Sequence, residues 1–222
     1  MNEYYLSRDK IITKTDEWMK SYNIPKYRSK NITFNHNNSA LIVIDMQEYF
    51  INENSHAFIP SAQFIIPNIN TLIKRYRKLG LPIIFTFHAY QNDEDPGIMG
   101  RWWKDVLRVN NPMSKIHSKI NWNKEDITLR KNRYSAFIGT KLDEILTCMN
   151  INTLIVSGIM THLCCESTAR DAFMRDYETY FVIDATAANS ELIHVSSLRT
   201  LVDGFVIPVK TSDIVKEMDN YE

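Results

Sequence analysis

Short apolar runs alternate with amphipathic segments along most of the chain. The apolar runs are rich in β-branched residues and show no polar alternation, which is typical of strands that are buried on both faces of a sheet. They predict strands at residues 40–45, 83–87, 153–158, 179–184 and 205–209. The segments between them repeat apolar residues at helical spacing and predict helices from about residue 67 to 79 and at residues 141–149, 161–176, 191–203 and 211–218.

A strand followed by a helix, repeated along a chain, is the pattern of a parallel sheet with helices on both faces. We therefore predict an α/β fold with a doubly wound, mostly parallel sheet in one domain at residues 39–222. Residues 88–127 interrupt the pattern and are rich in Trp, Pro, Asn and Gly. A loop of that length in a compact domain usually carries function.

Residues 1–38 precede the pattern and are interpreted as a separate N-terminal arm. The arm is polar, with Trp18, Tyr22 and Tyr27 placed among charged residues, and one short helix is expected in it. The aromatic side chains either dock the arm on the domain or hold it against a partner subunit. Because a polar arm has little to cover within one compact domain, we expect a homo-oligomer, most simply a homodimer.

Composition narrows the class of protein further. The 222 residues carry 26 Lys and Arg and 26 Asp and Glu, so the net charge is zero and no broad basic surface for nucleic acid is expected. No apolar run approaches the roughly 18 residues of a membrane span, and the polar start is unlike a signal peptide. Three cysteines without CxxC spacing exclude a disulfide scaffold and a zinc ribbon. We expect a cytoplasmic protein with reduced thiols.

Chemically useful side chains follow the predicted strands. Ligands of parallel sheets collect at the carboxyl ends of the strands. Asp45 closes the first apolar run, His88 follows the second, and Cys164 follows the strand that ends at Gly158. Lys131 lies in the cationic stretch LRKNR. Asp45, Lys131 and Cys164 would together supply a nucleophile and its base.

Electrostatics favours this set, although each member also has an ordinary interpretation. Cys164 lies in the first turn of a predicted helix, where the peptide dipoles favour a thiolate, and Lys131 would keep both other groups ionised. Alone, Asp45 could be a turn former, Cys164 a small core residue and Lys131 a solvated cation. We expect Cys165 and Cys148 in the core.

The stretches ALIVIDMQEYF, KNRYSAF, SGIMTHLCCESTARDAFMRD and FVIDATAA occur in this order between about residues 40 and 209. They resemble the isochorismatase-like cysteine hydrolases. The resemblance implies a three-layer α/β/α fold, a triad of Asp45, Lys131 and Cys164, and a cis peptide bond between Ile159 and Met160. It implies a small-molecule substrate and no cofactor.

By this resemblance the reaction passes through a thioester. Asp45 accepts the proton of Cys164, the sulfur attacks a carbonyl carbon, and the backbone N–H groups of Met160 and Cys164 receive the oxyanion. The nitrogen leaves, and water hydrolyses the thioester. The resemblance also assigns Met160, His88, Gln47 and Tyr134 to the oxyanion and substrate-binding positions.

The family contains two chemistries, and the chain has features of both. The arm, DMQEYF, RYSAF and DAFMRD resemble the isochorismatases, which cleave a vinyl ether and carry Gly, Gln and Tyr where this chain has Cys164, His88 and Met160. The stretch TxxCCESTARDA resembles amidase-type members, including those that act on ureido compounds. We therefore predict C–N bond hydrolysis of a small amide or ureido compound, with isochorismate hydrolysis as the alternative. A non-catalytic partner protein is a third reading, in which an intact Asp, Lys and Cys set would be unneeded.

The resemblance also bears on metals and on the substrate pocket. Nicotinamidases of the family bind a metal through an Asp and His cluster, and here only His56 and His88 fall in that region, so we expect neither a metal nor nicotinamidase activity. Residues 88–122 are expected to line the pocket together with the arm or a neighbouring subunit. Side chains that could contribute are Trp102, Trp103 and Trp122, with Arg101, Arg108 or Arg133 as possible ligands of a substrate carboxylate.

Overall fold

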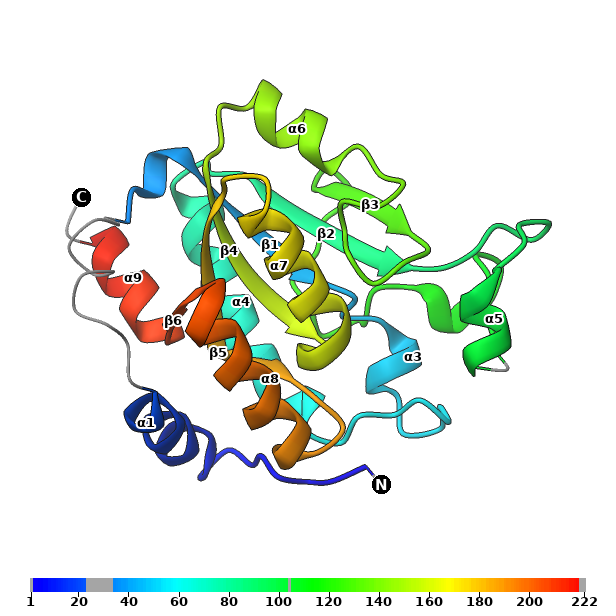
Figure 1. Ribbon diagram of the computed structural model, residues 1–222, viewed down its shortest axis with the longest axis horizontal. Coiled ribbons are helices and arrows are strands. Elements are labelled where there is room, and N and C mark those ends of the chain that lie inside the picture. Colours follow the sequence, from blue (N-terminus) through cyan, green and yellow to red (C-terminus); the bar gives the residue numbers. More distant parts are fainter. Residues whose placement is uncertain (1, 23–33, 104, 220–222) are drawn as a thin grey trace.

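The computed structural model describes residues 2–22, 34–103 and 105–219. Its centre is a six-stranded sheet in which every neighbouring pair is parallel, in the order β3-β2-β1-β4-β5-β6 (Figure 1). The predicted doubly wound α/β fold is confirmed. The strands are β1 (Ser39–Ile44), β2 (Ile83–His88), β3 (Ile127–Lys131), β4 (Thr153–Ile159), β5 (Glu178–Ala187) and β6 (Ile207–Val209).

The strand β3 was not predicted by the hydrophobic pattern. It pairs with β2 at the edge of the sheet, and four of its five residues are only partly buried. An edge strand of this kind needs no continuous apolar run. By contrast, every residue of β1 and β4 is buried, and both strands were predicted.

Helices cover both faces of the sheet, as the alternating pattern predicts. α7 and α8 pack on one face, and α4 and α9 pack on the other (Figure 1). α4 begins at Ala62, earlier than predicted, and Pro67 lies inside it, because the buried side of the helix already starts at Ala62 and Ile65. The bounds are α4 (Ala62–Lys78), α6 (Leu142–Cys148), α7 (Glu166–Phe173), α8 (Glu191–Gly204) and α9 (Thr211–Asp219), with the short helices α3 (Glu48–Ile51) and α5 (Ile98–Trp103) in the loops.

The described part of the arm packs on its own chain. α1 (Ile11–Ser21) packs against β5, and Lys14 forms an ion pair with Glu191, the first residue of α8. Tyr5 and Trp18 are buried in the main hydrophobic cluster. The argument that the arm has little to cover within one domain is therefore wrong. The homo-oligomer and the division at residue 38 remain predictions, and Tyr27 lies outside the described residues.

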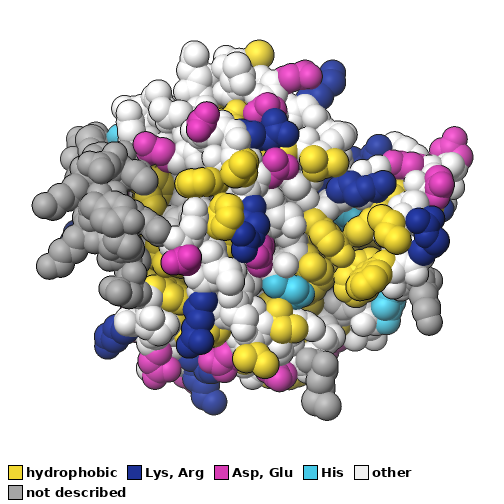
Figure 2. Space-filling model, in the orientation of Figure 1, with side chains coloured by type: hydrophobic (Ala, Val, Ile, Leu, Met, Phe, Trp, Pro, Cys, Tyr) yellow, Lys and Arg dark blue, Asp and Glu magenta, His cyan; other side chains and the backbone are white. Residues whose placement is uncertain are grey.

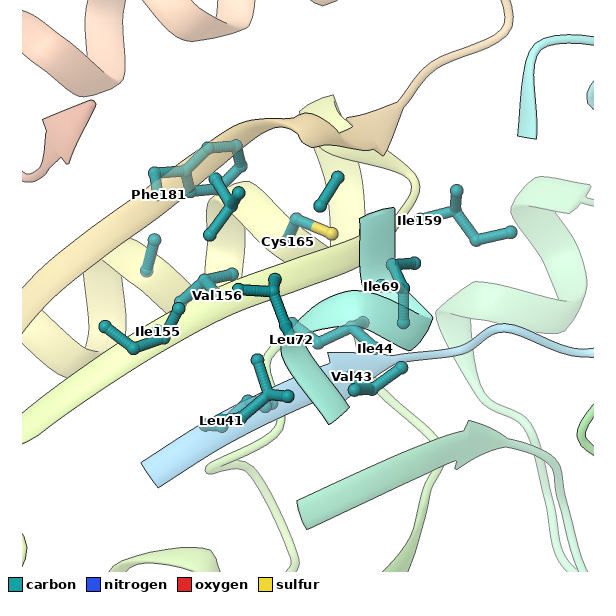
Figure 3. Packing of buried hydrophobic residues seen from close by; sticks show 14 of the residues in the cluster. Leu41, Val43, Ile44, Ile69, Leu72, Ile155, Val156, Ile159, Cys165 and Phe181 are labelled. Atoms are coloured by element: carbon teal, nitrogen blue, oxygen red, sulfur yellow. The ribbon is translucent and has the colours of Figure 1, made fainter. Parts of the chain in front are cut away.

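Charged side chains of both signs lie on the surface, as the net charge of zero suggests, and the apolar runs form the core. Figure 2 shows Lys and Arg side chains interspersed with Asp and Glu on the visible face. No helix in the described part of the chain is both long and apolar enough to cross a membrane. Inside, Leu41, Ile155 and Phe181 pack around the sheet together with the fully buried Cys165 (Figure 3).

Cys148 corrects the prediction for the cysteines. It is exposed at the end of α6, whereas Leu142 and Leu146 of the same helix are buried. Two residues beyond Leu146, the side chain points about 200° away from the buried face. Cys148 has apolar neighbours in the sequence, but these did not predict which face of α6 carries its side chain.

The sheet contains a topological switch point between β1 and β4. The chain leaves these adjacent strands toward opposite ends of the sheet, which opens a crevice beyond their carboxyl ends. The two strands approach closely there: Gly158 has φ +113°, and a Cβ atom on it would lie 2.1 Å from the backbone oxygen of Ile44. A glycine is required at this position.

Candidate active site

Asp45 lies at the carboxyl end of β1, beside the switch point. Its φ of +50° turns the chain sharply out of the strand, and its side chain is fully buried. The Thr86 hydroxyl donates to Asp45 Oδ1 at 2.7 Å. Thr86, in β2, was missed by the sequence analysis. Its polar side chain within the apolar run IIFTF was the available signal.

Lys131 ends β3 and connects the other two members of the predicted triad. Its Nζ lies 2.7 Å from Asp45 Oδ2 and donates to Cys164 Sγ at 3.2 Å. It also donates to the backbone oxygen of Arg133 at 3.0 Å. The structure thus brings Asp45, Lys131 and Cys164 together, although 119 residues separate the first from the last.

Cys164 lies in the turn that connects β4 to α7. The peptide bond between Ile159 and Met160 is cis, as the resemblance implies. Residues Thr161–Cys165 then form one π-helical turn, in which the Cys165 N–H donates to the Met160 oxygen. Cys164 is 5% exposed and faces the pocket.

The electrostatics of the site favour a neutral thiol at Cys164 and not the expected thiolate. Burial raises the pKa of Cys164 to about 12, with Lys131 opposing the shift and Asp45 adding to it. Burial disfavours the charge on Lys131, but Asp45 and Cys164 outweigh it and raise the lysine pKa. The resting site therefore holds a neutral thiol beside a lysine–aspartate ion pair. Desolvation of the buried sulfur thus opposes the thiolate that the sequence analysis expected.

A pocket of about 300 Å³ opens in front of Cys164. Three of the four predicted binding residues line it, namely His88, Tyr134 and Met160. Burial lowers the pKa of His88 to about 4, so this imidazole is neutral at neutral pH.

Gln47 does not line the pocket. Its side chain is fully buried, accepts from the His88 N–H at 2.7 Å and donates to the oxygens of His88 and Ser114. Gln47 thus ties the end of β2 to the long loop. Its assignment to substrate binding is corrected to a positioning role.

The outer wall comes from four separate parts of the chain, and sequence reasoning found only some of it. The predicted loop contributes Trp103, whose Nε1 donates to Tyr134 Oη at 2.8 Å. Trp102 is 72% exposed, and Trp122 bonds Thr128 away from the pocket. Asp105 and Asn2 also line the pocket, as expected for the long loop and for the arm, whereas Tyr49, His56 and Asn189 were missed as lining residues.

The three arginines considered for a substrate carboxylate do not line the pocket. Arg108 donates to the oxygens of Gln91 and Glu94, and Arg133 donates to the oxygen of Asn132. Arg101 borders a separate shallow depression near α5. Among the described residues there is also no group of three His, Cys, Asp or Glu side chains placed to hold a metal.

Comparison with known proteins adds to this geometry. A family model described as "Isochorismatase domain" matches residues 39–213. The chain is 36% identical to "Nicotinamidase 3" of Arabidopsis thaliana over 190 residues, which cover 84% of this chain and 92% of that one. It is 30% identical to "Ureidoacrylate amidohydrolase RutB" of Cronobacter sakazakii over 182 residues, which cover 72% and 78%.

A third relative is named as a synthase component. The chain is 32% identical to "Enterobactin synthase component B" of Escherichia coli (strain K12) over 184 residues, which cover 81% of this chain. The match spans only 63% of that protein's length.

Solved structures share the fold. A cysteine hydrolase from Pseudomonas syringae pv. phaseolicola superposes with a TM-score of 0.82 at 24% identity, covering 91% of this chain and all of that one. N-carbamoylsarcosine amidase from Thermoplasma acidophilum superposes with a TM-score of 0.68 at 27% identity, covering 78% and 96%.

Proposed function

Because the chain belongs to the isochorismatase family, we propose that it is a cysteine hydrolase that cleaves the C–N bond of a small amide or ureido compound. One observation carries the proposal: the Cys164 sulfur faces the pocket and accepts a hydrogen bond from Lys131, which is itself paired with Asp45. A nucleophile, a base and a cation are in contact at the inner end of the pocket, which is the arrangement that covalent catalysis needs.

The raised pKa of Cys164 determines how the first step proceeds. Since the resting thiol is neutral, Asp45 removes its proton as the sulfur attacks the carbonyl carbon, and a C–S bond forms. The oxyanion is received by the backbone N–H groups of Met160 and Cys164, an interaction worth about 10²–10³ in rate per donor in other enzymes.

The second half of the reaction returns the proton. Asp45 gives it to the nitrogen as the C–N bond breaks, and ammonia or an amine leaves. Water then attacks the thioester, its proton passes to Asp45 and on to the sulfur, and the acid is released. Lys131 stays charged throughout and stabilises the carboxylate and the transient thiolate.

Vinyl-ether hydrolysis of isochorismate is the alternative, favoured by a 30% identical relative named "Isochorismatase" from Bacillus subtilis (strain 168). That reaction requires an acid to protonate carbon and has no use for a nucleophile. Cys164 occupies space at the end of the pocket and supplies a sulfur that only an electrophilic carbon can use. The amide reading accounts for this residue, whereas the ether reading leaves it without a role.

Nicotinamide belongs among the test substrates. The expectation against nicotinamidase activity depended only on the missing metal motif, and the 36% identical relative carries that activity in its name. A flat carboxamide also suits a pocket that is lined by Phe50, Trp103 and Tyr134.

The test compares wild type with Cys164→Ala and Cys165→Ala on nicotinamide, other small amides, ureido acids and isochorismate. Ammonia release reports the amide reaction, and pyruvate release reports the ether reaction. We expect ammonia from at least one amide, a loss of at least about 10⁴-fold in Cys164→Ala, and retained activity in the core control Cys165→Ala. Robust pyruvate release by both wild type and Cys164→Ala would refute the proposal.

A cytoplasmic location and a homodimer complete the proposal. The first is supported by three cysteines that are all free in the structure. Cell fractionation and analytical ultracentrifugation test the two statements, and a monomer at micromolar concentration would rule out the dimer.

A further inference from the structure

The pocket lining contains few charged side chains. None of the described residues that line it is a lysine or an arginine. The nearest cation is Lys131, whose ammonium is fully buried against the Asp45 carboxylate, so the pair presents no net charge to a ligand. Lys104 lies outside the described residues.

The ionisable residues of the lining supply no compensating positive charge next to the nucleophile. Burial lowers the pKa of both His88 and His162, which keeps their rings neutral at neutral pH. The one carboxylate of the lining belongs to Asp105, at 3.0 Å from the Nε2 atom of the exposed His56 and also accepting from Tyr49.

The hydrogen-bonding groups of the wall point to the same kind of ligand. Asn189 Oδ1 is buried and has no hydrogen-bond partner among the described residues. This acceptor and the Asp105 carboxylate both suit a ligand that donates N–H groups. A substrate carboxylate placed against these two groups would meet oxygen acceptors, which cannot donate a hydrogen bond to it.

The rest of the lining is apolar or aromatic. Phe50, Met99, Trp103 and Leu163 contribute to it, and Figure 2 shows hydrophobic side chains gathered on the side of the visible face toward α5. A volume of about 300 Å³ is at the lower end for ligand sites, so the occupant is a small molecule with one flat apolar body.

We infer that the pocket selects uncharged carboxamides with a flat apolar body and rejects the same amide when it carries a carboxylate. The inference rests on the proposed amide hydrolysis for its chemistry and adds the charge of the substrate. It separates this chain from relatives whose names contain ureidoacrylate or carbamoylsarcosine, since both of those compounds are carboxylic acids.

The physical reason is that a substrate carboxylate loses its hydration in this pocket and gains no cation in exchange. A carboxylate leaves water at low cost only if cations or several charge-assisted hydrogen bonds replace its hydration, and no lysine or arginine lies among the described residues of this wall. The Asp105 charge adds repulsion, and a buried neutral imidazole at His88 supplies no counter-charge. An uncharged amide group of the same shape meets neither cost.

The test uses a matched pair of ligands, benzene-1,3-dicarboxamide and 3-carbamoylbenzoate, which differ only in replacing one amide by a carboxylate. Binding is measured by calorimetric titration of the full-length Cys164→Ala variant, so that it does not depend on turnover. Hydrolysis by wild type is followed in parallel as ammonia release. We expect the neutral member to bind at least about tenfold more tightly, and kcat/KM to follow the same order.

Asp105→Asn tests the origin of the preference, with the exposed Asp93→Asn as a control that removes the same charge away from the pocket. We expect Asp105→Asn to reduce the preference for the neutral ligand about threefold or more and Asp93→Asn to leave it unchanged. Equal or tighter binding of the carboxylate, or no binding of the neutral member, would overturn the inference. If binding shows the preference but no amide releases ammonia, the selectivity stands and the proposed function fails.

Discussion

The inner end of the pocket, which we propose as the catalytic end, and the outer wall are built in different ways. At the catalytic end, Asp45 and Lys131 have fully buried side chains on the ends of two strands of one sheet, and Cys164 follows a third. The outer wall is assembled from the N-terminal segment, the loop after α3, the α5 region and the end of β5, with partly exposed side chains such as Trp103 and Asp105. The difference indicates that chemistry is built into the sheet, while substrate choice depends on segments that the sheet leaves free to vary.

Removal of the buried cation Lys131 should cause the largest loss of both stability and catalytic rate. Lys131→Met leaves the Asp45 carboxylate unpaired in the interior, so we expect a free energy of unfolding lower by about 3–5 kcal/mol. The catalytic rate should fall at least about 10³-fold, because Cys164 and Asp45 lose their shared counter-charge. Urea denaturation and kcat/KM measure the two effects.

Two further variants separate stability from catalysis in this experiment. Lys124→Met, on the surface, should change neither quantity. The double variant Asp45→Asn, Lys131→Met should recover part of the stability but none of the activity, since it removes the unpaired charge together with the base. Activity in Lys131→Met within tenfold of wild type would contradict a catalytic end that depends on the ion pair.

The next largest effect should be a loss of stability when the close packing of β1 against β4 is disturbed. Gly158→Ala would place a methyl group 2.1 Å from the Ile44 oxygen at φ +113°, so we expect destabilisation of at least about 3 kcal/mol or failure to fold. Gly80→Ala is the matched control: φ is also positive, at +66°, but no atom lies within 4 Å, and a cost of about 1 kcal/mol is expected. Chemical denaturation of both variants checks the difference, and equal costs would show that β1 and β4 can separate.

Acid should weaken the fold through two imidazoles, those of the partly buried His88 and the fully buried His194. The pKa of His88 is lowered to about 4 and that of His194 to about 3, in each case mainly by burial. In the unfolded chain both titrate near 6.5, so as the pH falls below about 6.5 the unfolded state binds protons that the folded state does not. Stability is then lost by up to about 1.4 kcal/mol per pH unit for each histidine, down to about pH 4.

His88→Gln and His194→Gln should each flatten this dependence when the free energy of unfolding is measured between pH 7 and 4. His194 also bonds the Thr161 hydroxyl beneath the nucleophile turn, so its replacement should lower stability at pH 7, whereas His88→Gln should not. An unchanged pH slope in both variants would show that neither imidazole is held neutral by the fold.

The smallest effect is expected in the outer wall. Tyr134→Phe removes the hydrogen bond from Trp103, which joins two partly exposed side chains. A net contribution of about 0.5–1.5 kcal/mol predicts a rise in KM of a few fold with kcat nearly unchanged. Steady-state kinetics on the best amide tests this. A fall in kcat beyond tenfold would place Tyr134 in the chemistry and break the division between the two regions.

Much of the catalytic end was predictable because it follows the sheet. Asp45 and Cys164 stand directly after apolar runs, and parallel strands bring their carboxyl ends to one edge. Lys131 was a candidate only as part of a set with Asp45 and Cys164, and the family resemblance supported it, because its edge strand β3 has no apolar run to reveal it. Thr86 and Gln47 show what sequence cannot predict. A polar residue in a buried segment indicates that it has a hydrogen-bond partner, but the sequence does not identify that partner.

The sequence by itself determined the α/β class, most of the strands and the residues of the proposed triad, since hydrophobic periodicity and ordered motifs depend on neighbours along the chain. Only the tertiary structure decided that the arm packs on its own chain, that Cys148 is exposed, and that Asn2, Tyr49 and Asn189 meet at one wall. It also decided the protonation of Cys164, whose raised pKa results from burial by atoms distant in sequence. Desolvation is a sum over everything that surrounds a group in space, and no local pattern of residues contains that sum.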